Sequence, residues 1–397
     1  MKLEKVIYMN KIDLVFPYVD CNDPVWQKVY KEERRKNDLP TDISQVRFRE
    51  WNNLKYLFRS IEKFTPWIGN VYMIVSNKEQ VPEWVDTDEV HIVLHKDIIP
   101  EQFLPTFNST TIEMFLGNIK GLSERFIYAN DDMYFLKPLK EEDFFENAVP
   151  KLSVKTDKGL ETMFKKVEWK CLTTIAEHFG KKLPDPVEEG FLKLPHIFIP
   201  MSTETVRIIS KLFKPEIYSS ISQFRKAKNF NQYIYTYYQL FSGSYLESKR
   251  SYRYTSFKDS DTISKAKEIA KYITEQKYDS ICINDVVEFK NDSEFEMVKT
   301  IINSAIEKIL PDKSKYELED ENIEEKKLHI FKWLNKIGAT FQFKKEEEIR
   351  MFVEGVIDLV ERIRKTREEG IETSSEDSTS EDSTSEDSSF DESSKDN

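Results

Sequence analysis

The feature that most constrains the fold is an alternation of short β-type runs with helical patterns over residues 1–150. The pattern consists of the runs KIDLVFPYV (11–19), NVYMIVS (70–76), HIVLH (91–95) and RFIYA (125–129) and the helical segments REWNNLKYLFRSIEKF (49–64) and TIEMFLGNI (111–119). Strands joined through helices form a mostly parallel sheet whose faces the helices cover. The sequence therefore predicts an α/β fold with a Rossmann-like sheet, in which ligands gather at the carboxyl ends of the strands.

Length, cysteine usage and hydropathy bound the class of protein. A chain of 397 residues can bury a full core in one large domain or two modest ones. Cys21, Cys171 and Cys282 are odd in number and widely spaced, which predicts neither a disulfide framework nor a zinc site and fits a reducing compartment. The sequence contains no run of about 18 uncharged apolar residues. We therefore expect a cytoplasmic protein, with peripheral attachment to the inner face of the cell membrane as the open alternative.

The negative net charge is concentrated at the C-terminus. Residues 371–397 contain ten acidic residues and one lysine, a net charge of −9, so only −3 of the total −12 remains for the rest of the chain. A nucleic-acid-binding protein normally presents a basic face to the phosphates. The nearly balanced body of this chain therefore argues against a nucleic-acid partner.

The C-terminal segment after residue 310 departs from the α/β pattern. The tandem repeat SEDST, SEDST, SEDSS (375–389) has almost no apolar residues and predicts disorder, with a solubilising role favoured over a phosphorylated or partner-binding one. Residues 329–342 and 346–369 show the apolar spacing of amphipathic helices. The basic face of 361–367 suits either solvent exposure on a core-packed helix, the favoured interpretation, or contact with an anionic membrane. We predict a catalytic domain at 1–310, a helical extension at 311–370 and a disordered acidic tail at 371–397.

Two adjacent carboxylates follow the apolar run RFIYA, in the motif Asn130-Asp131-Asp132. At the end of a buried strand such carboxylates repel each other and lose hydration, so a cation or several hydrogen-bond donors must offset them. Mg²⁺ commonly binds through one or two carboxylates together with substrate phosphates. The motif therefore predicts a metal and diphosphate site, and a plain turn or helix cap is the alternative.

Other polar residues stand at comparable positions. Asp20 directly follows the first strand. Arg47 and Arg49 precede a helical pattern, where they suit either a phosphate or surface ion pairs. Asn108 and Ser109 begin another helical pattern, where they suit either an anion or sugar hydroxyl, or simple capping.

Three further positions extend the set. His196 lies among apolar residues in KLPHIFIP, where a core histidine is the favoured interpretation. Arg225 occurs in a polar segment, and Asn284-Asp285 ends the apolar run YDSICI.

The order of these segments resembles the Stealth family of capsular and exopolysaccharide phosphotransferases, which is similar to the catalytic part of the animal N-acetylglucosamine-1-phosphotransferase. The resemblance covers roughly residues 10–310 and rests on the segments 11–26, 47–77, 104–135, 194–200, 223–230 and 281–287. The longest of them ends in the specific motif FIYANDDMYF (126–135).

The resemblance implies transfer of a sugar 1-phosphate from a nucleotide sugar, commonly a UDP-sugar, to a glycan hydroxyl, with release of the nucleoside monophosphate. It further implies a glycosyltransferase-A-like fold, a divalent cation (Mg²⁺ or Mn²⁺), a nucleotide-sugar donor, a glycan acceptor and a role in capsule or cell-surface polysaccharide synthesis with membrane or capsule-assembly partners. Two alternatives stay open: a metal-dependent glycosyltransferase that forms a glycosidic bond, and a non-catalytic module that binds nucleotide sugars or glycans.

The family motifs also imply residue roles. The expected catalytic residues are Asp131, Asp132, His196 and Arg225, and the expected metal ligands are Asp131, Asp132 and Asp285. The expected substrate-binding residues are Asp20, Arg47, Arg49, Asn108, Ser109, Asn130 and Asn284. One position departs from the family pattern, because Gln223 stands where the family usually has an arginine, which predicts weaker phosphate binding there.

Overall fold

A computed structural model describes residues 11–39, 49–257, 261–285 and 289–318. All of these residues belong to one compact unit, Met1–Leu318, and a second unit comprises Glu319–Asn397. The expected helices at 329–342 and 346–369 and the acidic tail lie outside the described residues, so they and the predicted domain boundaries stay predictions.

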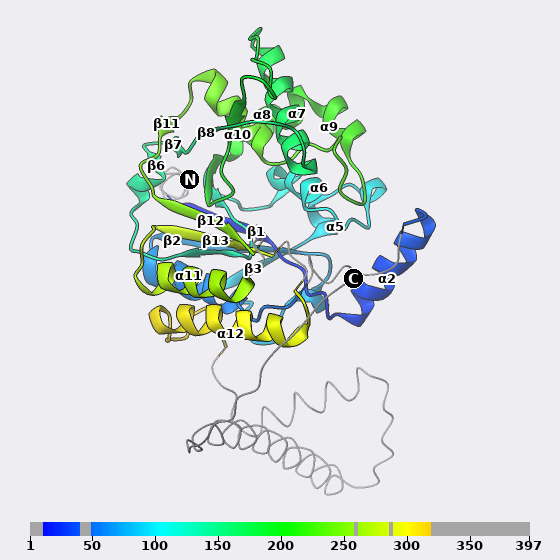
Figure 1. The fold of residues 1–397 in the computed structure, drawn as a ribbon. Helices are drawn as coiled ribbons and strands as arrows, with labels where there is room; N and C mark the ends of the chain where they lie inside the picture. The colour runs from blue at the N-terminus through cyan, green and yellow to red at the C-terminus, as the bar shows by residue number, and fades with distance from the viewer. Residues whose placement is uncertain (1–10, 40–48, 258–260, 286–288, 319–397) are drawn as a thin grey trace, which may run out of the picture. The chain divides into compact units, whose positions relative to one another are not determined.

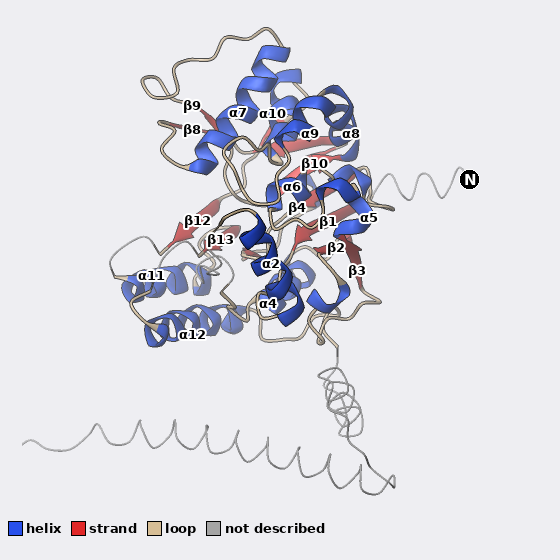
Figure 2. Ribbon diagram, turned by 90° about the vertical axis from the view of Figure 1, so that its right-hand side faces the viewer, coloured by secondary structure: helices blue, strands red, loops and turns tan. Residues whose placement is uncertain are grey.

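The main sheet has five strands in the order β10-β4-β1-β2-β3 (Figure 2). Its strands are β1 (Ile12–Pro17), β2 (Ile68–Val75), β3 (Val90–Leu94), β4 (Arg125–Tyr128) and β10 (Ile199–Ser202). Strands β1 to β4 pair in parallel, and β10 is antiparallel to β4 at one edge. The predicted α/β class with a mostly parallel, Rossmann-like sheet is confirmed.

The side chains of β1 explain why its sequence is a continuous apolar run. Leu14 and Phe16 face one hydrophobic core, whereas Val15 faces the other, and all three are fully buried. A strand that is buried on both faces cannot alternate apolar and polar residues. The helices therefore cover both faces of this sheet.

The helices divide between the two faces, with α7, α8 and α10 on one side of the main sheet and α11 and α12 on the other (Figures 1 and 2). Helix α4 contributes to the core that contains α11 and α12. The bounds of these helices are α4 Leu54–Phe64, α7 Met163–His178, α8 Thr203–Leu212, α10 Tyr233–Ser242, α11 Thr262–Thr274 and α12 Asp292–Ile309.

A second sheet, in the order β12-β13-β5, joins distant parts of the chain. Its strands are β5 (Met133–Phe135), β12 (Tyr252–Ser256) and β13 (Ser280–Asn284). Strand β13 is parallel to β12 and antiparallel to β5, and the backbone N–H of Ile283 donates to the carbonyl of Asp132 at 2.9 Å. This pairing brings the end of β13 to the Asn130-Asp131-Asp132 motif.

The remaining elements are short, apart from α2. They are α2 (Pro24–Lys36), α5 (His95–Ile98), α6 (Ser109–Glu113), α9 (Lys214–Ser220), β6 (Phe145–Glu146), β7 (Val149–Leu152), β8 (Lys155–Asp157), β9 (Phe191–Lys193), β11 (Leu246–Glu247) and the 3₁₀ turns Lys78–Gln80, Glu101–Phe103, Leu116–Asn118 and Glu141–Asp143. Among the described residues, no helix combines the length and apolar character needed to cross a membrane.

The helix expected over 111–119 is shorter in the structure, because α6 ends at Glu113 and a separate 3₁₀ turn follows. The β-branched residues Thr111 and Ile112 and the glycine Gly117 weaken helix propensity in this segment. Gly117 also lies against α8, where an added Cβ would approach Val206 Cγ1 to 3.0 Å. Close packing of the turn on α8 therefore replaces the continuous helix.

Candidate active site

A cavity of about 680 Å³ lies at the carboxyl ends of β1, β4 and β13. Strand β1 lies between β4 and β2, so the cavity is at the point where the strand order reverses, the usual ligand position in such sheets. Ten of the predicted site residues line it: Arg49, Asn108, Ser109, Asn130, Asp131, Asp132, His196, Arg225, Asn284 and Asp285.

Two predicted residues are not part of this lining. Asp20 is not among the residues that line the cavity, and its Oδ1 accepts from the backbone N–H of Asn22 at 2.8 Å. This is a turn contact, so the predicted substrate-binding role of Asp20 gains no support. Arg47 lies outside the described residues.

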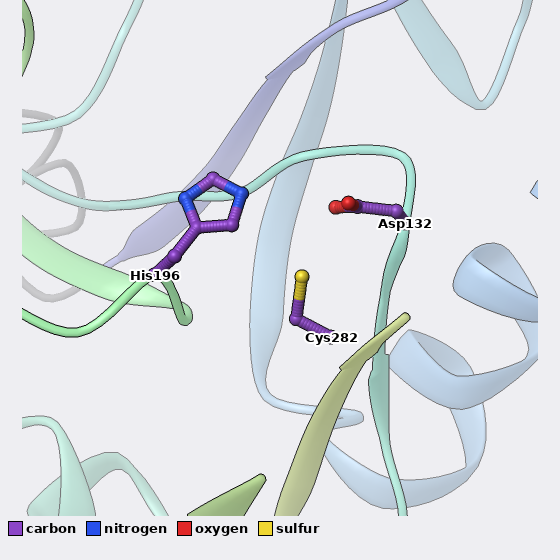
Figure 3. Close-up of side chains that lie close together, drawn as sticks. All are labelled: Asp132, His196 and Cys282. Atoms are coloured by element: carbon purple, nitrogen blue, oxygen red, sulfur yellow. The ribbon is translucent and has the colours of Figure 1, made fainter. Parts of the chain in front are cut away.

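Asp132 is the centre of a compact cluster of ionisable groups. A carboxylate oxygen of Asp132, a ring nitrogen of His196 and Sγ of Cys282 all lie within 4.8 Å of one another. Figure 3 shows these side chains pointing toward one another from the β4–β5 turn, the segment before β10 and strand β13. Three segments that are far apart in the sequence therefore supply one potential ligand set.

The two oxygens of Asp132 differ in their surroundings. Oδ2 accepts from Nδ2 of Asn284 at 3.1 Å, whereas Oδ1 is buried and has no hydrogen-bond partner among the described residues. A buried carboxylate oxygen without a partner costs free energy unless a donor or cation compensates it. Burial lowers the pKa of His196, although Asp132 opposes the shift, so the imidazole tends to be neutral and able to act as a ligand.

The neighbouring Asp131 is partly buried and differs from Asp132 in its electrostatics. Burial raises the pKa of Asp131 to about 7, and the charge of Asp132 adds to the shift. The backbone N–H of Met133 also donates to the carbonyl of Asn130 at 3.2 Å, so the motif makes a turn as well. The turn interpretation and the site interpretation of this motif are therefore compatible.

The residues of the cluster fit a divalent cation. Asp132 offers an uncompensated oxygen, His196 a nitrogen and Cys282 a sulfur, and all three atom types ligate metals. Burial, with a further contribution from Asp132, raises the pKa of the Cys282 thiol well above its ordinary value. The thiol is therefore protonated at neutral pH, and Asp132 and His196 are the stronger ligand candidates.

Asp285 has other partners in the structure. Its Oδ2 lies 3.1 Å from Nη1 of Arg49 and accepts from Nε1 of Trp51 at 3.0 Å. Among the described residues, the grouped ligand atoms around Asp132 include neither Asp285 nor Asp131. The metal-binding roles predicted for these two aspartates stay predictions.

Arg225 is positioned at the start of α6. Its Nη2 donates to Oγ of Ser109 at 2.8 Å. The nearby Glu113 is buried and accepts from the Tyr128 hydroxyl and from the backbone N–H of Gln232, both at 3.1 Å. Burial raises the pKa of Glu113, and the positive charge of Arg225 opposes this shift. The arginine is thus held in the cavity wall close to a buried carboxyl group.

Asn108 acts as a helix cap, since its Oδ1 accepts from the backbone N–H of Thr110 at 3.1 Å. Its amide also donates to the carbonyl of Ser222 at 3.0 Å. Gln223, the departure from the family pattern, bonds through Nε2 to Glu33 of α2 at 2.8 Å and does not line the cavity.

Sequence reasoning missed three residues of this region. Glu113 and Glu50 line the cavity, and Cys282 joins Asp132 and His196. A signal existed only for Cys282, because it precedes Asn284 by two residues on a strand and therefore faces the same side. In the described structure, Cys21, Cys171 and Cys282 are free thiols.

The fold and the cavity first define a class, namely an α/β protein with a cavity at the carboxyl ends of its strands that charged and polar side chains help to line. Comparison with known proteins narrows this class. The family description Stealth protein CR2, conserved region 2, matches residues 47–152. A capsular polysaccharide phosphotransferase WcwK of Streptococcus pneumoniae is 31% identical over 349 residues, covering 78% of this chain and 98% of the relative. The receptor polysaccharide phosphotransferase WefC of Streptococcus oralis is 28% identical over 342 residues, covering 78% and 100%.

The chain therefore belongs to the Stealth family and is an enzyme of the phosphotransferase class, as the order of its motifs predicted. Among solved structures, the galactosyltransferase LgtC, in complex with donor and acceptor sugar analogs, matches with a TM-score of 0.36 and 10% identity. The match covers 74% of this chain and 96% of that protein.

Proposed function

We propose that the protein transfers a hexose or N-acetylhexosamine 1-phosphate from a nucleotide sugar, a UDP-sugar, to a glycan hydroxyl and releases UMP. The product is a phosphodiester linkage in a capsular or cell-surface polysaccharide. The observation that carries the proposal is the uncompensated, buried Oδ1 of Asp132 in a cavity that also contains His196 and Arg225. The names of the relatives, capsular and receptor polysaccharide phosphotransferases, support the choice of reaction and acceptor.

The reaction requires positioning and charge compensation more than covalent catalysis. The acceptor oxygen attacks the β-phosphorus in line, and the bond from this phosphorus to the bridging oxygen breaks. UMP leaves with the bridging oxygen, and the sugar–oxygen bond stays intact. Arg225 compensates phosphate charge, and the hydroxyl proton passes to a carboxylate or imidazole of the cavity wall, formed by Asp131, Asp132 and His196.

Asp132 and His196, with Cys282 beside them, would hold a divalent cation, Mg²⁺ or Mn²⁺. When bound, the cation would supply positive charge for the pyrophosphate. The imidazole nitrogen favours Mn²⁺ of these two, because Mg²⁺ prefers an all-oxygen set. Asn130, Asn284 and Arg49 line the same cavity and are the proposed substrate-binding groups.

The test is incubation of the full-length protein with a panel of nucleotide sugars and oligosaccharide acceptors, with Mg²⁺, with Mn²⁺ or with a chelator. We expect a phosphodiester signal in ³¹P NMR and UMP in equal amount. UDP together with a glycosidic bond would instead identify a glycosyltransferase. Tight binding of the nucleotide sugar without any product would identify a binding module.

The site of action is also a proposal. We infer that the enzyme works in the cytoplasm at the inner face of the membrane, beside capsule-assembly partners, because its family acts in polysaccharide synthesis. Fractionation of cells that produce the tagged full-length protein tests this placement. Recovery outside the cytoplasm and the inner-membrane fraction would contradict it.

A further inference from the structure

We propose that Tyr254 is a positioning residue that acts through Asn284 to orient the carboxylate of Asp132. The inference rests on the proposed function, because it concerns how the proposed site presents its cation ligand. Tyr254 belongs to none of the predicted motifs, and it does not line the cavity. Its role is therefore exerted on other residues and not on the substrate.

The first argument is a chain of two hydrogen bonds. The Tyr254 hydroxyl donates to Oδ1 of Asn284 at 3.2 Å, and Nδ2 of Asn284 donates to Oδ2 of Asp132 at 3.1 Å. An ionised carboxylate only accepts hydrogen bonds, so the amide must turn its NH₂ group toward Asp132. Its carbonyl oxygen then faces Tyr254, which is the side chain that can donate to it.

The second argument is the arrangement of the strands. Tyr254 of β12 is directly paired with Cys282 of β13, and Asn284 follows Cys282 by two residues. Residues two apart on a strand project from the same face. The ring of Tyr254 also contacts His196 edge-on, with ring centroids 5.9 Å apart and an angle of 77° between the rings. Tyr254 therefore contacts two of the groups that surround Asp132.

The consequence concerns the two oxygens of Asp132. Oδ2 accepts from Asn284, Oδ1 is buried without a hydrogen-bond partner among the described residues, and one oxygen of this carboxylate lies within 4.8 Å of the ligand atoms of His196 and Cys282. If the amide is held by Tyr254, the carboxylate cannot rotate freely, and its Oδ1 is presented in a fixed direction. Outer partners of this kind tune the affinity of metal ligands by fixing their orientation.

The experiment is Tyr254→Phe in the full-length protein, which removes the hydroxyl and keeps the ring against His196. Mn²⁺ binding to the metal-stripped protein is measured by isothermal titration calorimetry. We expect Mn²⁺ affinity to fall about tenfold, with a comparable fall in kcat/KM for phosphodiester formation. Thermal unfolding should stay close to that of the wild type, because Tyr254 is 40% exposed. Tyr252→Phe is the matched control on the same strand and should change neither quantity.

Two results would overturn the inference. One is a Mn²⁺ affinity of Tyr254→Phe within twofold of the wild type. The other is wild-type Mn²⁺ binding that is undetectable or is unaffected by Asp132→Asn, since Asp132 would then hold no cation. Failure of the proposed function is distinguishable: if no phosphodiester forms but Tyr254→Phe weakens Mn²⁺ binding, the positioning role stands and the reaction is wrong.

Discussion

Asp132→Asn separates the chemical role of this residue from its structural role. The substitution conserves shape and removes the negative charge. The amide oxygen can replace Oδ2 and still accept from Asn284, so the NH₂ group takes the place of Oδ1. An NH₂ group cannot bind a cation or accept a proton. The hydrogen bond from Asn284 is thus kept, while the carboxylate oxygen without a hydrogen-bond partner is lost.

The substitution should lower turnover strongly but should not lower the free energy of unfolding. General base catalysis alone contributes about 10²–10⁴-fold, so turnover should fall by at least about 10²-fold, or about 2.7 kcal/mol of activation free energy. The uncompensated Oδ1 costs the folded state about 1–3 kcal/mol. Removing its charge should therefore leave the free energy of unfolding unchanged or raise it by about 1 kcal/mol.

The assay combines the initial rate of UMP release, in the presence of Mn²⁺ and acceptor, with urea unfolding of the same preparation. Asp88→Asn is the matched control, because Asp88 is exposed and does not line the cavity. Near-normal turnover of Asp132→Asn would refute the assignment. A loss of stability above about 2 kcal/mol would show instead that Asp132 is chiefly structural.

Three further predictions concern other residues. Arg225→Lys keeps the charge but loses the planar fork that binds phosphate, so KM for the donor should rise about tenfold in steady-state kinetics; an unchanged KM would contradict phosphate binding by Arg225. Burial raises the pKa of Glu168 from its ordinary 4.5 to about 7, so the unfolded chain releases its proton first and stability falls as pH rises from about 4.5 to 7. In urea unfolding, the free energy of unfolding should fall by about 2–3 kcal/mol less between pH 5 and pH 7.5 in Glu168→Gln than in the wild type. An equal fall in both proteins would contradict this account. Asp13 is fully buried and accepts from the backbone N–H groups of Asn70 and Ser123, both at 2.8 Å, so Asp13→Asn should cost about 2–3 kcal/mol in urea unfolding while the donor KM stays normal; unchanged stability would contradict this account.

The main sheet could be predicted because its strands carry a local signal. Strands β1, β2 and β4 are buried on both faces or nearly so, and each is therefore a short apolar run between helical patterns. The edge strand β3 is only partly buried, but it is also mostly apolar. Strand β10 was not predicted as a strand, because its residues 199–202 belong to a segment that was interpreted only as a motif. The pairing of β5 with β13 joins residues about 150 positions apart, and nothing in either three- to five-residue segment specifies its partner.

The site was predictable to the extent that its residues follow strands. Asp132 and Asn284 lie together because β4 and β13 end at the same cavity, and the long-range pairing of β13 with β5 brings this about. Cys282 was missed because the spacing between cysteines reveals only sites made by several cysteines. The neighbours of Cys282 in the structure are an aspartate and a histidine. Glu113 was missed because a glutamate at the end of a short helix has no local signal of burial.

The cavity gathers several carboxyl groups, and the way each is compensated explains where a ligand is required. The carboxylate of Asp285 is compensated by an ion pair with Arg49 and a hydrogen bond from Trp51. Glu113 accepts hydrogen bonds from the Tyr128 hydroxyl and from a backbone N–H. Burial and the charge of Asp132 raise the pKa of Asp131 to about 7, so a proton neutralises this carboxylate in part at neutral pH. Asp132 has a partner on Oδ2 only, so the described protein groups leave half of its carboxylate uncompensated. Because a buried charge is stable only when it is matched, the cation and the phosphates it binds are required at Asp132 more than at the other acidic residues of the cavity.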